Sequence, residues 1–185
     1  VTVVSRGRAG GYTMNLPLEE KYLNNRKEFK DDIAGTLGGY VAEKLVFGDI
    51  TTGPSNDLQV VSRLARSMVT KWGMSDVIGP VALEGKDSEV MFGRGFGNEY
   101  SEKMSDVIDQ EIKKLIDEGL ATAEKVLTEK RAVLDDMAKI LVEKETLEQD
   151  EYNDFLKKHG IPLKELLKKD IKPTKTDEPV KEEVK

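Results

Sequence analysis

The segment TTGPSNDLQVVSRLARSMVTKWG, residues 51–73, joins a loop to a helical pattern of apolar residues. Threonine, glycine, proline and serine fill its first five positions, which is a composition typical of turns. From residue 57 onward, apolar residues recur at the spacings of three and four that mark the buried face of a helix: Leu58, Val61, Leu64, Ala65, Met68, Val69 and Trp72. The segment therefore predicts a turn that leads into a core helix, with Gly73 as its stop.

A second helical pattern precedes this turn, over about residues 25–47. Its apolar side chains recur every four residues: Phe29, Ile33, Leu37, Val41 and Leu45. Glycines at positions 35, 38 and 39 interrupt the pattern, and each interior glycine costs a helix about 1 kcal/mol relative to alanine. We expect another element to approach closely at these glycines, or the helix to break there.

The rest of the chain reads as further helices with little β structure. Residues 78–98, with PVAL and a glycine-rich run, predict a short strand and a mobile loop. Apolar periodicity over residues 101–127 and 129–143 predicts an antiparallel helical pair, and residues 148–158 predict a shorter helix. The charged, proline-containing residues 170–185 predict a disordered tail.

The N-terminal residues predict the only other β structure. VTVVS (1–5) and YTMNLP (12–17) are β-branched or alternating, and the basic, glycine-rich RGRAGG between them predicts a turn. The expected fold class is therefore mainly α, of the α+β type, with a small N-terminal β portion. Because the chain opens on Val1 inside a strand pattern, we expect it to be a fragment or a processed product.

The composition excludes several kinds of active site and partner for this chain. The 185 residues include no cysteine, which excludes disulfides, thiolate nucleophiles and cysteine-based zinc sites. A net charge of −6 argues against a nucleic-acid partner, which needs a basic face. No run of 18 or more apolar residues and no secretory signal are present. The only histidine, His159, follows a predicted helix end, where a solvated imidazole is the simplest interpretation.

Asp57 has two interpretations on the residues alone. Asn56 and Gln59 have the spacing of a capping box, and an acid at position 57 would favour the start of the following helix through its dipole. Alternatively, the carboxylate is an acidic ligand that points into a site. The helix pattern does not decide between these two roles.

Four segments in order carry a family resemblance: RGRAGGYT (6–13), LGGYVAEKLVFG (37–48), TTGPSNDL (51–58) and LARSMVTKWGMSDVIGP (64–80). Together they resemble the peptidase domain of the FtsH-type, membrane-anchored, ATP-dependent zinc metalloproteases, over residue 1 to about residue 150. The resemblance implies that residues 1–160 are the C-terminal part of a zinc metallopeptidase domain. Residues 161–185 are then a short terminal helix and a charged, disordered tail.

The resemblance implies a role for Asp57. In that family two histidines of a His-Glu-x-x-His helix and a later aspartate hold Zn²⁺, and the glutamate of the motif is the general base. Asp57 matches the aspartate, and a ligand set of this kind leaves a fourth position open for water. No His-Glu-x-x-His occurs in these 185 residues, so we expect that motif just before Val1 and no catalytic residue within the chain. ATP and Mg²⁺ would belong to an ATPase module further upstream.

Other site residues are implied less directly. Glu43 would lie near the metal and orient one of the histidines, or it is simply a polar-face helix residue. Lys44 departs from the family, which usually has a second acid there. The strand that contains Gly11, Tyr12, Thr13 and Met14 would be the edge along which an extended protein substrate adds its backbone.

Two function classes remain open at this point. The first is a fragment of a membrane-anchored, ATP-dependent zinc endopeptidase that degrades unfolded or membrane proteins. Its parent would be a hexameric ring at the cytoplasmic face of the cell membrane, tethered by N-terminal segments absent from this chain. The alternative is a non-catalytic helical module for interaction or oligomerisation, derived from the same family.

Overall fold

The computed structural model describes residues 1–3, 23–83 and 101–162, and these residues are mainly helical. They divide into two compact units, residues 21–143 and residues 1–20 with 144–185. The predicted strand at 12–17, the glycine-rich loop at 93–98 and the tail at 170–185 lie outside the described residues. The helical class is confirmed, whereas the described part of the chain contains no strand, only an isolated β-bridge between Thr2 and Thr146.

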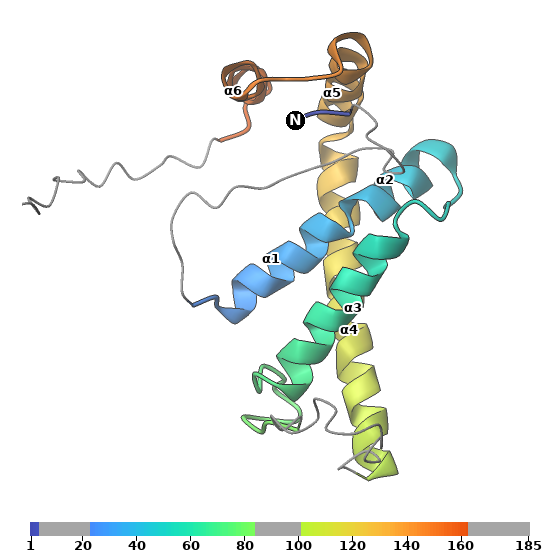
Figure 1. Ribbon diagram of the computed structural model, residues 1–185, viewed down its shortest axis with the longest axis vertical. Coiled ribbons are helices and arrows are strands. Elements are labelled where there is room, and N and C mark those ends of the chain that lie inside the picture. Colours follow the sequence, from blue (N-terminus) through green and yellow to red (C-terminus); the bar gives the residue numbers. More distant parts are fainter. Residues whose placement is uncertain (4–22, 84–100, 163–185) are drawn as a thin grey trace, which may run out of the picture. The chain divides into compact units, whose positions relative to one another are not determined.

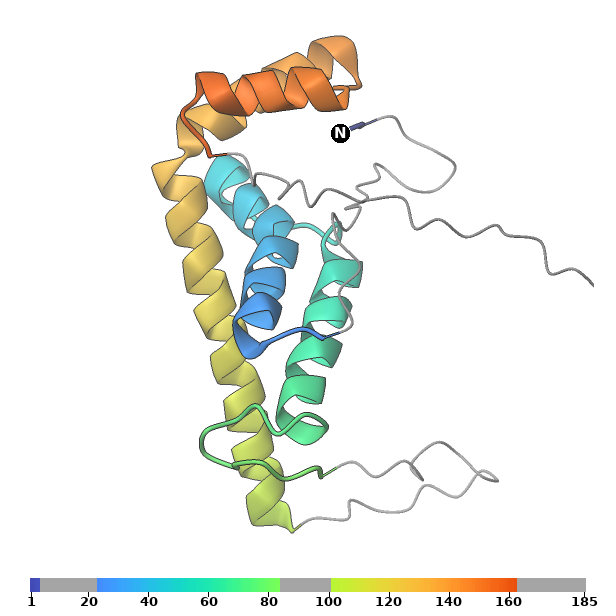
Figure 2. The same ribbon diagram turned by 90° about the vertical axis from the view of Figure 1, so that its left-hand side faces the viewer.

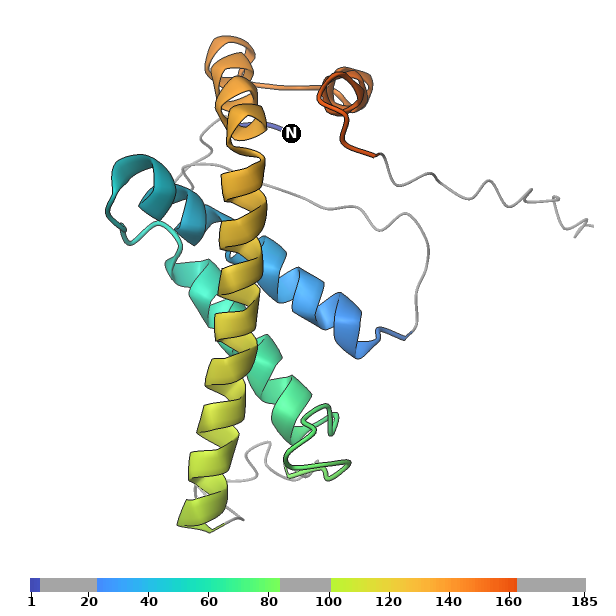
Figure 3. The ribbon, with the colours of Figure 1, turned by 180° about the vertical axis from the view of Figure 1, so that it is seen from behind.

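The unit of residues 21–143 is built on one long helix, α4 (Glu102–Glu129). Three shorter helices pack against it: α1 (Arg26–Thr36), α2 (Gly38–Phe47) and α3 (Ser55–Thr70). Figures 1, 2 and 3 show α1 and α3 side by side across one face of α4. The core lies where these faces meet and contains Ile33, Leu37, Val41, Val61, Ala65, Met68, Val69, Ile108, Leu115 and Ala123.

The predicted helix over 25–47 is present but is interrupted at Leu37. Asn25 begins α1 with a capping box to Glu28, and α2 starts directly after Leu37, which is buried. Gly48 ends α2 in the left-handed conformation, at a φ of 71°, which a glycine adopts without strain. The expected helix break at the glycines is confirmed, because α1 and α2 are separate helices.

α3 carries much of the predicted apolar stripe into the core. Val61, Ala65, Met68 and Val69 are buried, as the spacing predicts. The two ends of the predicted stripe behave differently, since Leu58 is 39% and Trp72 46% exposed. Trp72 instead stacks its ring on Phe29 of α1, with the ring centroids 4.6 Å apart.

The segment after α3 forms no strand at PVAL, so that prediction is wrong for residues 80–83. Its chain is attached to the helices by side chains. Ser75 donates a buried hydrogen bond of 2.7 Å to Glu111 of α4, and Arg26 makes a two-pronged ion pair with Asp76 at 2.6 and 2.8 Å. These contacts hold the segment against the helices, in place of the backbone hydrogen bonds that a paired strand would make.

The predicted antiparallel pair of helices is wrong in its arrangement, although both helices exist. α5 (Arg131–Lys144) follows α4 after the single residue Lys130, which is too short a link for a helical hairpin. The described residues show no packing of α5 along α4. Arg131 instead donates to the backbone carbonyl of Leu45 in α2, at 3.2 Å.

The other unit contains α6 (Gln149–Lys158), close to the predicted 148–158. Glu148 caps this helix; Phe155 within it and Leu147 just before it are buried. Residues 1–3 lie antiparallel to 145–147, with Val3 N–H donating to Glu145 and Leu147 N–H to Val1. Among all the described helices, none is both long and apolar enough to cross a bilayer.

Candidate metal centre

Asp57 lies in the first turn of α3. The helix begins at Ser55, with Pro54 as its N-cap, so the prediction of Asn56 as the cap residue is wrong. The backbone closes this start without a side-chain cap, since Ser55 N–H donates to Thr52 at 3.2 Å and Leu58 N–H to Pro54 at 3.0 Å. Asp57 is therefore the third residue of the helix, where the dipole favours a carboxylate.

The geometry leaves the Asp57 carboxylate free of a capping role. In a capping box the third helical residue accepts a hydrogen bond from the N-cap backbone N–H, and Pro54 has no N–H to donate. The carboxylate is half-buried, and no hydrogen bond joins it to the rest of the described chain. A half-buried carboxylate without a local partner is a ready acceptor for a cation or a donor.

The side chain of Asp57 faces the start of α2. A Cβ added to Gly39 would lie 4.0 Å from Oδ2 of Asp57, which is an ordinary contact, and one added to Gly35 or Gly38 would meet nothing within 4 Å. Of the two expectations for these glycines, the helix break is therefore present and the close approach is not. Gly39 and Glu43 are four residues apart on α2 and share one face of it. The same face of α2 therefore borders both Asp57 and the loop before it.

Glu43 is hydrogen-bonded to that loop. Its Oε2 accepts from the backbone N–H of Thr51 at 2.9 Å, and the Thr51 hydroxyl lies 3.0 and 3.1 Å from its two oxygens. The hydroxyl also accepts from the N–H of Gly53, at 3.0 Å. Glu43 is thus more than a solvated polar-face residue, because it connects α2 to the turn before α3.

Thr51 is the residue of this site that the sequence did not single out. The sequence did contain a local indication of the bond to Gly53, because a threonine hydroxyl in a turn commonly bonds a backbone group two residues further along the chain. The bond to Glu43, eight residues away, had no such local signal. The predicted substrate-binding residues Gly11, Tyr12, Thr13 and Met14 lie outside the described residues.

His159 belongs to the other unit. It follows α6 as the C-cap and packs its ring against Phe155, with centroids 4.4 Å apart. The described residues contain no group of three histidine, cysteine, aspartate or glutamate side chains that could hold a metal ion. Asp57 fits a metal as one ligand of a larger set, and the rest of that set is not among the described residues.

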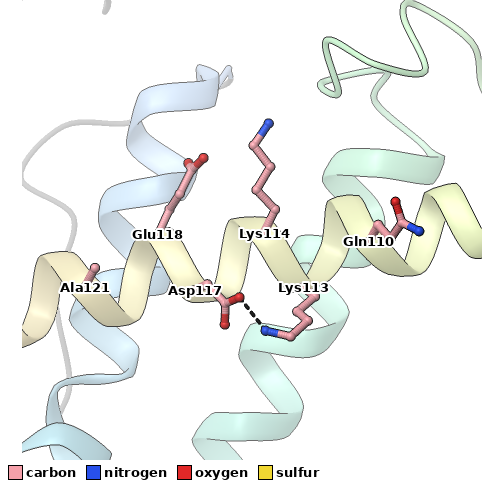
Figure 4. Close-up of a pocket in the computed structure, with 6 residues that line it drawn as sticks. All are labelled: Gln110, Lys113, Lys114, Asp117, Glu118 and Ala121. Carbon is pink, nitrogen blue, oxygen red and sulfur yellow. Dashed lines mark hydrogen bonds and ion pairs between the residues drawn. The ribbon is translucent and has the colours of Figure 1, made fainter.

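A surface hollow lies on another part of the unit, along α4. Figure 4 shows that its lining comes from one helix, α4, with Gln110, Lys113, Lys114, Asp117, Glu118 and Ala121. Its charges are already paired with each other or with neighbours: Lys113 with Asp117, and Glu118 with Lys30 at 2.7 Å. This open, internally paired surface has no convergent group that would select a ligand.

Comparisons with known proteins place the chain in a family. Peptidase family M41 matches residues 1–155. An ATP-dependent zinc metalloprotease FtsH 2 of Alkaliphilus metalliredigens is 49% identical over 154 residues, covering 82% of this chain and 22% of the relative. FtsH 1 of a Thermoanaerobacter species is 47% identical over 154 residues, covering 82% and 25%. FtsH of Bacillus subtilis is 41% identical over 165 residues, covering 88% and 26%, so the chain spans about a quarter of these relatives.

Proposed function

The chain belongs to peptidase family M41, and we therefore propose that it is the Asp57-bearing part of the catalytic domain of an ATP-dependent zinc metalloendopeptidase. One observation carries the proposal. The carboxylate of Asp57 stands half-buried at the start of α3, beside Gly39, without a capping role. That is the state required of a metal ligand, and the relatives are named as zinc metalloproteases.

In this proposal Asp57 is one of three protein ligands of Zn²⁺. The other two are the histidines of a His-Glu-x-x-His helix, which cannot come from a sequence with a single histidine. Zinc, when bound, supplies a Lewis acid that polarises a peptide carbonyl and activates water. The contribution of this chain is to hold an anionic ligand at a fixed place and to shield it on one side with α2.

Glu43 and the N-terminal segment have supporting roles. Glu43 keeps acceptor capacity beyond its bonds to Thr51, so it remains the proposed partner that orients a ligating histidine. Gly11, Tyr12, Thr13 and Met14 remain the proposed edge for an extended protein substrate. Residues 1–160 are assigned to the peptidase domain, and 161–185 to its terminal helix and tail.

The parent protein is proposed to be a hexameric ring that takes unfolded or membrane proteins as substrates. ATP and Mg²⁺ would act in a separate module that drives these substrates toward the peptidase. A membrane anchor would hold the ring at the cytoplasmic face of the cell membrane. The support for these features is membership of the family, since this chain covers only 22% of its relative from Alkaliphilus metalliredigens.

The test is Asp57→Asn in the full-length protein. Asparagine retains a short polar side chain at the helix start but removes the anionic ligand. Zinc affinity, measured by competition with a chelator, and casein hydrolysis should both fall by orders of magnitude, while ATP hydrolysis persists. Asp31→Asn is the matched control, because Asp31 is an exposed carboxylate on α1.

Two results would reject the proposal. The first is an Asp57→Asn protein that binds zinc and cleaves casein like the wild type. The second is a wild-type full-length protein that holds no zinc and cleaves nothing. The second result would favour the alternative of a non-catalytic oligomerisation module.

A further inference from the structure

We propose that Thr51 is a positioning residue whose hydroxyl fixes the turn that orients Asp57 toward the metal ion it binds. The hydroxyl lies between the Glu43 carboxylate of α2 and the backbone N–H of Gly53, and we call this set the Glu43–Thr51–Gly53 clasp. The inference rests on the proposed function only in naming that metal ion as zinc. The clasp itself is a property of the described residues.

The hydroxyl has one donor and two acceptor sites, and the clasp uses both kinds. Thr51 Oγ1 donates toward the Glu43 carboxylate, at 3.0 Å from Oε1 and 3.1 Å from Oε2. It accepts from Gly53 N–H at 3.0 Å. One atom therefore connects α2 to the backbone that immediately precedes α3.

The connection reaches Asp57 through a short and stiff path. Gly53 is followed by Pro54, the N-cap of α3, whose ring fixes its φ near the observed −74° and whose side chain is buried. Asp57 is three residues further on, in the first helical turn. Because no side chain of the described residues caps α3, the turn is what sets where this helix begins.

Gly53 shows how closely the clasp is packed. A Cβ added there would lie 3.1 Å from Oε1 of Glu43 and 3.2 Å from the Thr51 hydroxyl. Both distances are tighter than nine in ten real Cβ contacts, so a larger residue would displace the Glu43 carboxylate or the Thr51 hydroxyl by a few tenths of an ångström. Glycine at this position leaves room for the hydrogen bonds and not for a side chain.

The clasp has a direct consequence for the metal ligand. Groups that orient a metal-binding side chain typically change metal affinity by about 10- to 100-fold when they are removed. Thr51→Val keeps the shape of the side chain and removes its hydroxyl, which leaves Glu43 with only the Thr51 N–H and Gly53 N–H without its acceptor. Thr51→Ser restores the hydroxyl.

The first measurement is amide hydrogen exchange on the full chain of 185 residues. In Thr51→Val the Gly53 amide should exchange about tenfold faster than in the wild type, and in Thr51→Ser at nearly the wild-type rate. The matched control is Thr122→Val, because the Thr122 hydroxyl bonds only the Glu118 carbonyl of its own helix. An unchanged Gly53 amide in Thr51→Val would overturn the clasp.

The second measurement is the zinc affinity of the full-length protein, by chelator competition. Thr51→Val should weaken zinc binding about tenfold, with Thr51→Ser and Thr122→Val within about twofold of the wild type. In an Asp57→Asn background, Thr51→Val should have no further effect, because the clasp acts through Asp57.

The outcomes separate the two proposals. If Asp57→Asn abolishes zinc binding but Thr51→Val leaves it unchanged, the positioning role fails and the proposed function stands. If Asp57→Asn itself leaves zinc binding unchanged, the proposed function fails. A tenfold loss in Thr51→Val that persists in the Asp57→Asn background would refute the route through Asp57.

Discussion

Gly119→Ala should destabilise the unit of residues 21–143, although alanine is the better helix former. Gly119 lies inside α4, where α1 crosses it. A Cβ added there would lie 2.5 Å from Cγ2 of Ile33 and 3.4 Å from the backbone nitrogen of Ala34. Carbon atoms in contact sit about 3.5–4.0 Å apart, so the first of these contacts is about 1 Å too short.

The magnitude follows from two opposing terms. Alanine in a helix interior gains about 1 kcal/mol over glycine. Overpacking a core costs about 1–3 kcal/mol, and this site is at the upper end because Ile33 is fully buried and its β-branched side chain is stiff. The free energy of unfolding should therefore fall by about 2 kcal/mol, the difference between these two terms.

The measurement is urea unfolding followed by fluorescence. The only tryptophan, Trp72, stacks on Phe29 of α1 and reports on this unit. Gly35→Ala is the matched control, since a Cβ at Gly35 meets nothing within 4 Å, and it should raise the free energy of unfolding by about 0.5–1 kcal/mol. If Gly119→Ala is as stable as Gly35→Ala, the close crossing of α1 and α4 is refuted.

Three further predictions concern a buried contact, an ion pair and the metal. Ser75→Ala removes the donor that Glu111 uses in the interior, so the free energy of unfolding should fall by about 2 kcal/mol in urea titrations, and an unchanged value would contradict the buried bond. The Arg26 guanidinium holds the pKa of Asp76 below its ordinary value of 3.8, so this pair contributes stability above that pH and loses it as the pH falls through the folded pKa. Unfolding curves of Asp76→Asn should then depend less on pH below 3.8, and an unaltered profile would show that the pair does not act in solution. The 185-residue chain contains one histidine and no cysteine, so Asp57 lacks the partners of a three-ligand zinc site. The chain alone should therefore retain no stoichiometric zinc after dialysis. One equivalent of zinc found by metal analysis would contradict this prediction.

Local pattern was enough to predict which residues form helices. The stripe through Ile33, Val41, Val61 and Met68 does face the core, because a helix repeats its buried face every three to four residues wherever it packs. The helix predicted at 148–158 is α6, and its start is set by neighbouring residues of the same segment. These features depend on the spacing of residues close together in the chain, which can be read directly from the sequence.

The arrangement of the helices required the tertiary structure. The apolar patterns of α4 and α5 are compatible with a hairpin, but the single residue between the two helices does not reverse the chain. Leu58 has the right spacing for the core and is still exposed, since the face of α3 that is buried depends on where α4 and α1 lie. Periodicity reports that a face is apolar and says nothing of which element covers it.

The candidate site divides in the same way. The sequence by itself placed Asp57 at the start of a helix and, through its resemblance to a family, suggested a metal ligand there. Only the folded chain shows that Pro54 rather than Asn56 is the cap, with no N–H for the Asp57 carboxylate to accept from, and that Thr51 meets Glu43 eight residues earlier. That contact forms because the chain reverses after α2 and brings the loop back against it. The angle of such a reversal is set by backbone dihedrals and packing together, which no residue pattern encodes alone.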